Sequence, residues 1–155
     1  MTCATTRPSI PSRAAPKKQC IPLGENAPRV LLADDCEEVG LTTAEILESE
    51  FHVVGLARNG VEVLDLVVKS SPNALVLDLF MPLLNGIETA EHVKASGSPT
   101  PVVILTVQED ADFVDAAMSA GALGYVLKPH AVTDLVPAVR AVLQGKVYVS
   151  PSMRF

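Results

Sequence analysis

From Arg29 onward, the chain alternates short apolar runs with longer segments whose apolar residues recur at helical spacing. A short apolar run favours a buried strand, and apolar residues at i, i+3 and i+4 favour a helix with one buried face. Five such pairs predict a five-stranded parallel sheet with helices on both faces, a doubly wound α/β fold. The predicted strands are Arg29–Ala33, Phe51–Ala57, Ala74–Leu77, Pro101–Leu105 and Gly124–Leu127, and the predicted helices are Glu37–Ser49, Val61–Lys69, Asn85–Ala95, Asp110–Ala120 and Thr133–Gln144.

Capping and turn residues mark the ends of the last two predicted helices. Asp110 and Thr133 are predicted to cap their starts, because short polar side chains accept hydrogen bonds from the first free N–H groups. Gly121 and Gly145 stand where these helices are expected to end in a left-handed residue. Pro137 is expected at the end of the first turn of the last helix, where a missing N–H costs little.

Composition limits the class of protein. The chain has 155 residues, of which 48% are apolar and only 4% aromatic, and it contains no Trp. A single domain with a core of Val, Leu, Ile and Ala is therefore expected. Disorder of the whole chain and a large multidomain enzyme are excluded. The longest uncharged stretch, Ala95–Gln108, carries two prolines and is shorter than a membrane helix, so we expect a soluble protein without membrane contact.

The first 28 residues differ from the rest of the chain. They hold five of the twelve prolines and four basic residues against one acid, so the remainder is more acidic than the net charge of −6 indicates. Repeated prolines oppose an amphipathic helix, which favours a disordered tail over an organelle transit peptide. The domain is expected over residues 29–151, with a short tail at 152–155. An acidic body of this kind disfavours direct nucleic-acid binding.

The three cysteines also bear on the class of protein. They are odd in number and lack Cys-x-x-Cys spacing, so they indicate neither a disulfide framework nor a zinc site. A reducing compartment, the cytoplasm, is the predicted location.

Polar residues follow or end four of the predicted strands. The first strand leads into Asp34 and Asp35 and the third into Asp78, while Thr106 and Lys128 follow the fourth and fifth. In parallel α/β folds, ligands bind beyond the carboxyl ends of the strands. If the first, third and fourth strands are neighbours, the gathered carboxylates need a cation, and Mg²⁺, or alternatively Mn²⁺, suits oxygen ligands. The pattern predicts metal-assisted phosphoryl transfer.

Each of these residues has a simpler interpretation when it is taken alone. The pair Asp34-Asp35 would more often cap a helix, and Thr106 would be an ordinary strand residue. Only the coincidence of the pair with Asp78 and Lys128 at matching strand ends favours a site.

Four motifs, in order, resemble the receiver domain of two-component response regulators. The resemblance covers residues 29–151 and implies the flavodoxin-like receiver fold. The stretches Gly124–Pro129 and Gly145–Pro151 are similar to the NarL/FixJ branch of these proteins. The four motifs are Asp34-Asp35, the segment Val76-Leu77-Asp78-Leu79-Phe80-Met81-Pro82 with Asn85-Gly86 after it, Thr106, and Lys128-Pro129.

The resemblance implies that Asp78 accepts a phosphoryl group from a histidine kinase or a histidine phosphotransfer protein. Asp35, Asp78 and the backbone carbonyl of Phe80 would bind Mg²⁺, and Asp34 would act through a water. Lys128 would neutralise charge on the phosphoryl oxygens. Beyond its own phosphorylation and dephosphorylation, the chain is expected to catalyse no reaction.

The resemblance also implies a conformational switch. Thr106 would donate its hydroxyl to a phosphoryl oxygen and draw its loop inward, while Tyr125 would move from an exposed to a buried position. Tyr125 has a simpler interpretation as a core residue. The signalling surface would comprise the fourth helix, the fifth strand and the fifth helix, and its partner would be a downstream protein or a second copy of the chain.

Three residues near the expected acceptor bear on how fast it would be phosphorylated and dephosphorylated. Val107 stands where these domains carry a small residue, usually Ala, so phosphorylation and dephosphorylation are predicted to be slow. Phe80 is apolar and could shield the phosphoryl group from water, whereas Gln108 could orient a water toward it.

Several rival functions remain at the level of sequence. A haloacid-dehalogenase-like phosphatase would place a second Asp where this chain has Phe80, and an FMN protein would need a Ser/Thr-rich loop where this chain is acidic. A receiver fragment of a NarL/FixJ-type DNA-binding regulator, without its helix-turn-helix domain, is one alternative to a stand-alone receiver. A phosphate-independent interaction module is another.

Overall fold

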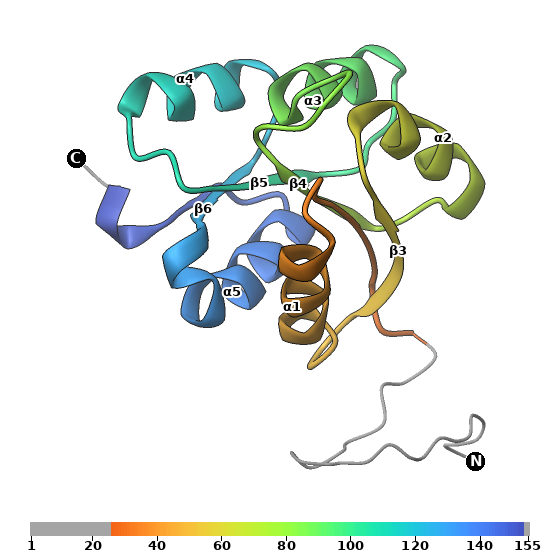
Figure 1. Cartoon of the computed structure of the whole chain (residues 1–155), viewed down its shortest axis with the longest axis horizontal. Coiled ribbons are helices and arrows are strands. Elements are labelled where there is room, and N and C mark those ends of the chain that lie inside the picture. Colours follow the sequence, from red (N-terminus) through yellow and green to blue (C-terminus); the bar gives the residue numbers. More distant parts are fainter. Residues whose placement is uncertain (1–25, 154–155) are drawn as a thin grey trace.

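The computed structural model describes residues 26–153. Of the tail expected over residues 1–28, residues 1–25 lie outside the described part of the chain. Within the described part, six parallel strands form one sheet in the order β3-β2-β4-β5-β6-β7 (Figure 1). The strands are β2 Arg29–Ala33, β3 His52–Ala57, β4 Ala74–Asp78, β5 Val102–Thr106, β6 Gly124–Leu127 and β7 Tyr148–Val149.

Helices cover both faces of the sheet, which confirms the doubly wound α/β fold. Helices α1 and α5 lie on one face, and α2, α3 and α4 lie on the other (Figure 1). Among the described helices, none is long and apolar enough to cross a bilayer. The helices are α1 Glu37–Leu47, α2 Gly60–Ser70, α3 Gly86–Ala95, α4 Ala111–Ser119 and α5 Ala131–Leu143, with short 3-10 turns at η1 Lys128–His130 and η2 Pro151–Met153.

The two faces of the sheet bury separate apolar clusters. Alternate residues of a strand point to opposite faces, so Leu31 of β2 packs toward α2, α3 and α4 while Val30 and Leu32 pack toward α1 and α5. Strands β4 and β5 are buried along their whole length, as expected for central parallel strands. The rigid centre of the sheet therefore fixes the strand ends that follow it.

Strand order brings the acidic residues together. The first strand, β2, lies between β3 and β4, so the chain reverses its winding direction between β2 and β4. Ala33 of β2 is in register with Leu77 of β4. The residues that come next, Asp34 and Asp78, therefore lie side by side at the carboxyl edge of the sheet, at the switch point where ligands of such folds bind.

Several helix ends follow the sequence prediction. Asp110 caps α4 by accepting a hydrogen bond of 2.9 Å from the amide of Asp112. Gly121 and Gly145 adopt φ values of 105° and 78°, the left-handed region that glycine enters at low cost. Asn85 starts α3 with a reciprocal capping box with Glu88.

The start of α5 differs from the prediction. The helix begins at Ala131, not at Thr133, because the turn η1 leads directly into it. Thr133 is therefore not a cap, and its hydroxyl instead lies 3.2 Å from the carbonyl of His130. Pro137 consequently falls in the second helical turn, not at the end of the first, where proline removes the hydrogen bond to the carbonyl four residues earlier.

The end of the chain also differs from the prediction. A sixth strand, β7, joins the edge of β6 with Tyr125 opposite Val149. The turn η2 then buries Met153, which is only 3% exposed, so packing continues past the expected boundary at Pro151. Two residues of strand are too short to produce a recognisable apolar run, and the edge of β6 is what orders them.

Candidate functional site

Three carboxylates gather at the carboxyl edge of the sheet. Asp34 and Asp35 follow β2, Asp78 ends β4, and one ligand oxygen of each lies within 4.8 Å of the others. Asp34 and Asp78 are buried, whereas Asp35 is exposed. The amide of Cys36 donates a 2.9 Å hydrogen bond to Asp34 Oδ1, which fixes this carboxylate at the start of α1.

Lys128 lies opposite the carboxylates. Its Nζ is 3.2 Å from Asp34 Oδ2 and 3.2 Å from Asp78 Oδ2. Burial by itself lowers the pKa of this ammonium, but the charges of Asp78 and Asp34 outweigh it and raise the pKa above its ordinary value. Lys128 therefore remains a cation that bridges the two buried acids.

The surroundings of Asp78 shift its pKa. Burial raises its pKa to about 6, and the neighbouring charges of Asp34 and Asp35 act in the same direction, while Lys128 lowers it. One ammonium thus does not compensate three carboxylates. A hard divalent cation with oxygen ligands fits this excess of negative charge, and Mg²⁺ is such an ion.

The loop after β4 follows the acceptor position. Phe80, whose backbone carbonyl was assigned to the metal, lies two residues beyond Asp78, and its side chain is 49% exposed. The Phe80 ring packs edge-to-face against Phe113 of α4, with 5.8 Å between ring centroids. The loop then returns to the sheet through a 2.7 Å hydrogen bond from the amide of Gly86 to the carbonyl of Leu79.

The two residues expected to form the switch, Thr106 and Tyr125, lie on neighbouring strands. Thr106 ends β5 and is buried, and its Oγ1 accepts a hydrogen bond of 3.2 Å from the amide of Gln108. Tyr125 of β6 is fully buried and donates from its hydroxyl to the carbonyl of Gln108 at 2.8 Å. Burial, with the charge of Asp110, raises the pKa of Tyr125 to about 12. Tyr125 therefore occupies a buried position, which fits its interpretation as a core residue as well as the end point of the expected movement.

Val107 follows Thr106 and leaves its side chain 59% exposed. Together with Phe80, it places apolar surface on the two loops that follow the neighbouring strands β4 and β5.

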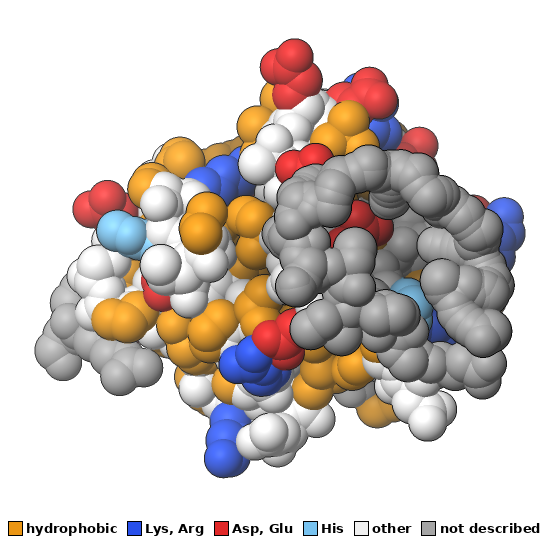
Figure 2. All heavy atoms as spheres, turned by 90° about the horizontal axis from the view of Figure 1, so that it is seen from below, with side chains coloured by type: hydrophobic (Ala, Val, Ile, Leu, Met, Phe, Trp, Pro, Cys, Tyr) orange, Lys and Arg blue, Asp and Glu red, His pale blue; other side chains and the backbone are white. Residues whose placement is uncertain are grey.

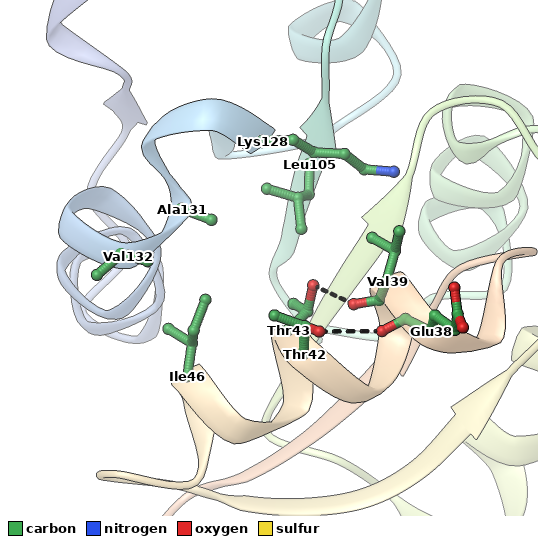
Figure 3. Close-up of a pocket in the computed structure, with 9 residues that line it drawn as sticks. All are labelled: Glu38, Val39, Thr42, Thr43, Ile46, Leu105, Lys128, Ala131 and Val132. Carbon is green, nitrogen blue, oxygen red and sulfur yellow. Dashed lines mark hydrogen bonds between the residues drawn. The ribbon is translucent and has the colours of Figure 1, made fainter.

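A groove runs from Lys128 along the space between α1 and α5 (Figure 3). It has a volume of roughly 290 Å³, and its walls are mainly aliphatic. Val132, on α5, is 78% exposed, and Val39 and Leu41 leave further apolar surface on α1. The space-filling view from the side of α1 and α5 shows apolar side chains gathered on this face (Figure 2). The lining residues are Glu38, Val39, Thr42, Thr43, Ile46, Leu105, Lys128, Ala131 and Val132.

The sequence did not indicate this groove. Its sequence signal is one exposed apolar residue, Val132, in a helix whose other exposed residues are Thr133 and Arg140. Such isolated apolar residues are common on protein surfaces, so only the arrangement in space distinguishes this one.

A family model and curated proteins match this chain. The model described as the response regulator receiver domain matches residues 30–140. The chain is 35% identical over 116 residues to the response regulator MprA of Mycobacterium sp. (strain KMS), which covers 75% of this chain and 50% of MprA. MprA of Mycobacterium leprae gives the same identity, with 51% of that protein covered. The chain thus spans about half the length of these curated relatives.

Solved structures of response regulators and of their receiver domains are also similar to this chain. A LuxR-family two-component response regulator from Aurantimonas is 30% identical with a TM-score of 0.79, covering 83% of this chain and 93% of that one. The signal receiver domain of the putative response regulator NarL from Mycobacterium tuberculosis is 29% identical with a TM-score of 0.73, covering 77% and 98%. The isolated receiver domain of RcsB from Salmonella enterica serovar Typhimurium, in the presence of phosphomimetic BeF3-, is 27% identical with a TM-score of 0.75, covering 83% and 96%.

Proposed function

Because this chain belongs to the response regulator receiver domain family, we propose that Asp78 accepts a phosphoryl group from a histidine kinase or a histidine phosphotransfer protein in a Mg²⁺-dependent reaction. The observation that carries the proposal is the position of Lys128. Its ammonium lies between Asp34 and Asp78, at the edge of the sheet where three carboxylates converge. Mn²⁺ is the expected substitute for Mg²⁺ because it accepts the same oxygen ligands.

The reaction forms one bond and breaks one. A carboxylate oxygen of Asp78 attacks phosphorus in line, and the phosphorus–nitrogen bond to the donor histidine breaks. Mg²⁺, when held by Asp35, Asp78 and the carbonyl of Phe80, would neutralise negative charge on the phosphoryl oxygens. Lys128 adds a second positive charge close to Asp78. Positioning and electrostatics thus supply the rate, and the chain needs no further catalytic group.

Phosphorylation would then change the shape of the domain surface through two residues, Thr106 and Tyr125. Thr106 carries a buried hydroxyl at the end of β5, where a phosphoryl oxygen on Asp78 of the adjacent strand is within its reach after a small loop movement. The same loop carries Gln108, whose carbonyl holds the hydroxyl of Tyr125. An inward pull on Thr106 is therefore transmitted to Tyr125 and to the surface of α4, β6 and α5.

We propose that a protein donor docks in the groove between α1 and α5. The groove begins at Lys128, whose Nζ reaches Asp78, so a helix seated there would lie next to the acceptor. Its aliphatic lining and the exposed Val132 suit the apolar face of an amphipathic helix. A small donor such as acetyl phosphate needs no such contact.

The output would be a change in binding to a downstream protein or to a second copy of the chain. We propose that the chain acts in the cytoplasm, that it does not itself bind nucleic acid, and that it catalyses only its own phosphorylation and dephosphorylation. Because it spans half of its curated relatives, its place in a longer DNA-binding regulator is the second candidate. A structure of two RcsB dimers bound to two parallel DNAs, in which the match covers 66% of the RcsB chain, favours that candidate. The intact acids, Thr106 and Lys128 argue against a phosphate-independent module.

Mass spectrometry after incubation with acetyl phosphate and Mg²⁺ tests the proposal. The parent protein should gain the mass of one phosphoryl group, and EDTA should abolish the gain. Asp78→Asn should gain none, whereas Asp115→Asn, which changes an exposed carboxylate on α4, should behave like the parent. Equal labelling of Asp78→Asn and the parent would overturn the assignment of the acceptor.

A further inference from the structure

The residues that follow α5 are attached to the strand that carries Tyr125. We refer to Tyr148–Met153 as the C-terminal segment. The amide of Tyr148 donates to the carbonyl of Leu123, and the amide of Ser150 donates to the carbonyl of Tyr125, both at 2.9 Å. Met153 is buried in the same apolar cluster as Tyr125. The segment is therefore a docked part of the domain.

Ser150 is the centre of this attachment. It is fully buried, and its Oγ accepts a 3.0 Å hydrogen bond from the amide of Leu127 and donates a 3.0 Å hydrogen bond to Asp134 Oδ2. Asp134, a buried acid of α5, also lies 3.2 Å from the hydroxyl of Thr133. One hydroxyl thus joins the end of β6, the first turn of α5 and the C-terminal segment. A buried polar network whose members are all paired specifies one arrangement of these elements.

Strand β6 carries Tyr125 and leads directly into Lys128, two residues of the proposed site. Leu127, held by Ser150, precedes Lys128 directly, and the ammonium of Lys128 reaches both Asp34 and Asp78. Tyr125, whose carbonyl accepts from Ser150, sends its hydroxyl to Gln108. The backbone of residues 125–127 is therefore held from one side by the C-terminal segment, while its neighbours act in the site.

From these contacts we propose that the C-terminal segment helps to set the geometry of the phosphoryl-acceptor site. Ser150 would be a positioning residue for Lys128 and Tyr125. This inference rests on the proposed function. Docking and phosphorylation favour the same arrangement, with Tyr125 buried and Lys128 directed at Asp78. Because coupling between two events is reciprocal, phosphorylation of Asp78 should in turn strengthen docking of the segment.

Ser150→Ala with Ser152→Ala as its matched control tests the forward direction. Both variants remove one hydroxyl, but Ser152 is exposed and lies only two residues away. Ser150→Ala should slow phosphorylation by acetyl phosphate and Mg²⁺ about fivefold because Lys128 is less well positioned, and Ser152→Ala should match the parent. Ser150→Thr, which keeps the hydroxyl, should recover part of the rate.

Hydrogen exchange on the unmodified chain tests the reverse direction without any variant. Exchange of the amides of Leu127 and Ser150, which make the two docking hydrogen bonds, should slow about fivefold when Asp78 is phosphorylated. Amides of Val63 and Val67 on the remote helix α2 serve as the internal reference. This measurement decides the question even if Ser150→Ala does not fold.

The possible outcomes distinguish a failure of this inference from a failure of the proposed function. If the parent gains no phosphoryl group from acetyl phosphate or from a cognate kinase, the proposed function fails. If the parent is phosphorylated but the amides of Leu127 and Ser150 exchange at unchanged rates, the segment is a passive edge strand and the inference is overturned. A folded Ser150→Ala that is phosphorylated at the parent rate overturns it equally.

Discussion

Asp78 combines two properties that a surface carboxylate does not have. It is buried, and it shares its surroundings with two other acids, so its charged form is disfavoured until cations approach. Lys128 supplies one of these cations from within the chain. These surroundings are what the proposed Mg²⁺ binding and phosphoryl transfer require, and they carry a cost in stability when neither Mg²⁺ nor a phosphoryl group is present.

That cost predicts a pH-dependent effect of Asp78→Asn in metal-free buffer. A pKa of about 6 in the folded protein, against 3.8 ordinarily, means that folding favours the protonated acid. This contribution is fully present below about pH 4 and is lost as the pH rises through 6. Relative to the parent, Asp78→Asn should therefore gain on the order of 1 kcal/mol between pH 4.5 and pH 8.

Urea unfolding with EDTA at both pH values measures this difference. Asp115→Asn controls for loss of an exposed negative charge. A stability difference between Asp78→Asn and the parent that is the same at both pH values would show that Asp78 ionises as it does in a free peptide.

Val107 is expected to slow both phosphorylation and dephosphorylation of Asp78. Its branched side chain stands next to Thr106 where the resembled domains carry a small one, so Val107→Ala should widen the path to Asp78. Phosphorylation by acetyl phosphate and loss of the phosphoryl group should both become several-fold faster. Val68→Ala, which trims an equally simple side chain on α2 that is 80% exposed, should change neither rate. A Val107→Ala variant with parental rates would remove Val107 as a barrier.

Helix ends position the loops of the proposed site. The capping box of Asn85 and Glu88 starts α3 where the loop after Asp78 returns to the sheet. The turn η1 joins β6 to α5 and carries Lys128. The second junction places Lys128 three residues before the start of α5.

We predict that Asn85→Ala lowers the free energy of unfolding by about 1 kcal/mol, the usual cost of losing an N-cap. The two hydrogen bonds of the box, from Glu88 N to Asn85 Oδ1 at 2.8 Å and from Asn85 N to Glu88 Oε1 at 3.0 Å, would no longer act together. Chemical denaturation measures the loss. Asn85→Asp, which keeps an accepting oxygen, should retain most of the stability, and a full loss in this variant would contradict the capping role.

The groove between α1 and α5 predicts a difference between two kinds of donor. Val132→Glu places a charge in its aliphatic lining, so transfer from a phosphorylated histidine kinase or phosphotransfer protein should slow at least several-fold. Labelling by acetyl phosphate, which needs no docking, should be unchanged. Val68→Glu is the matched control because Val68 is equally exposed but lies on α2. Equal kinase transfer to Val132→Glu and Val68→Glu would place the docking surface elsewhere.

The fold concentrates negative charge at one edge of a sheet whose central strands are buried along their whole length. The described carboxylates of the site face one ammonium, and the chain as a whole carries a net charge of −6. A divalent cation that binds this edge relieves the repulsion only in the folded state, because strand order is what gathers the acids. Cation binding should therefore be visible as a gain in global stability.

Addition of Mg²⁺ should raise the thermal unfolding midpoint of the parent. At a free concentration of roughly 100 times Kd, the stabilisation expected from binding is about 2.7 kcal/mol. Asp35→Asn should weaken the response, and NaCl at matched ionic strength controls for screening. Differential scanning calorimetry measures both. If Mg²⁺ and NaCl shift the midpoint equally, the acids form no specific cation site.

Local patterns in the chain were enough to predict the doubly wound α/β fold and to place the acids, Thr106 and Lys128 at the strand ends, because strand and helix periodicities and strand-end residues can be read without knowledge of the packing. They did not determine the start of α5, where the turn at Lys128–His130 overrode the capping preference of Thr133. Nor did they indicate β7, the groove beside Val132 or the hydroxyl of Ser150 between Leu127 and Asp134. These features depend on contacts between residues far apart in sequence, so they follow only from how the strands and helices pack.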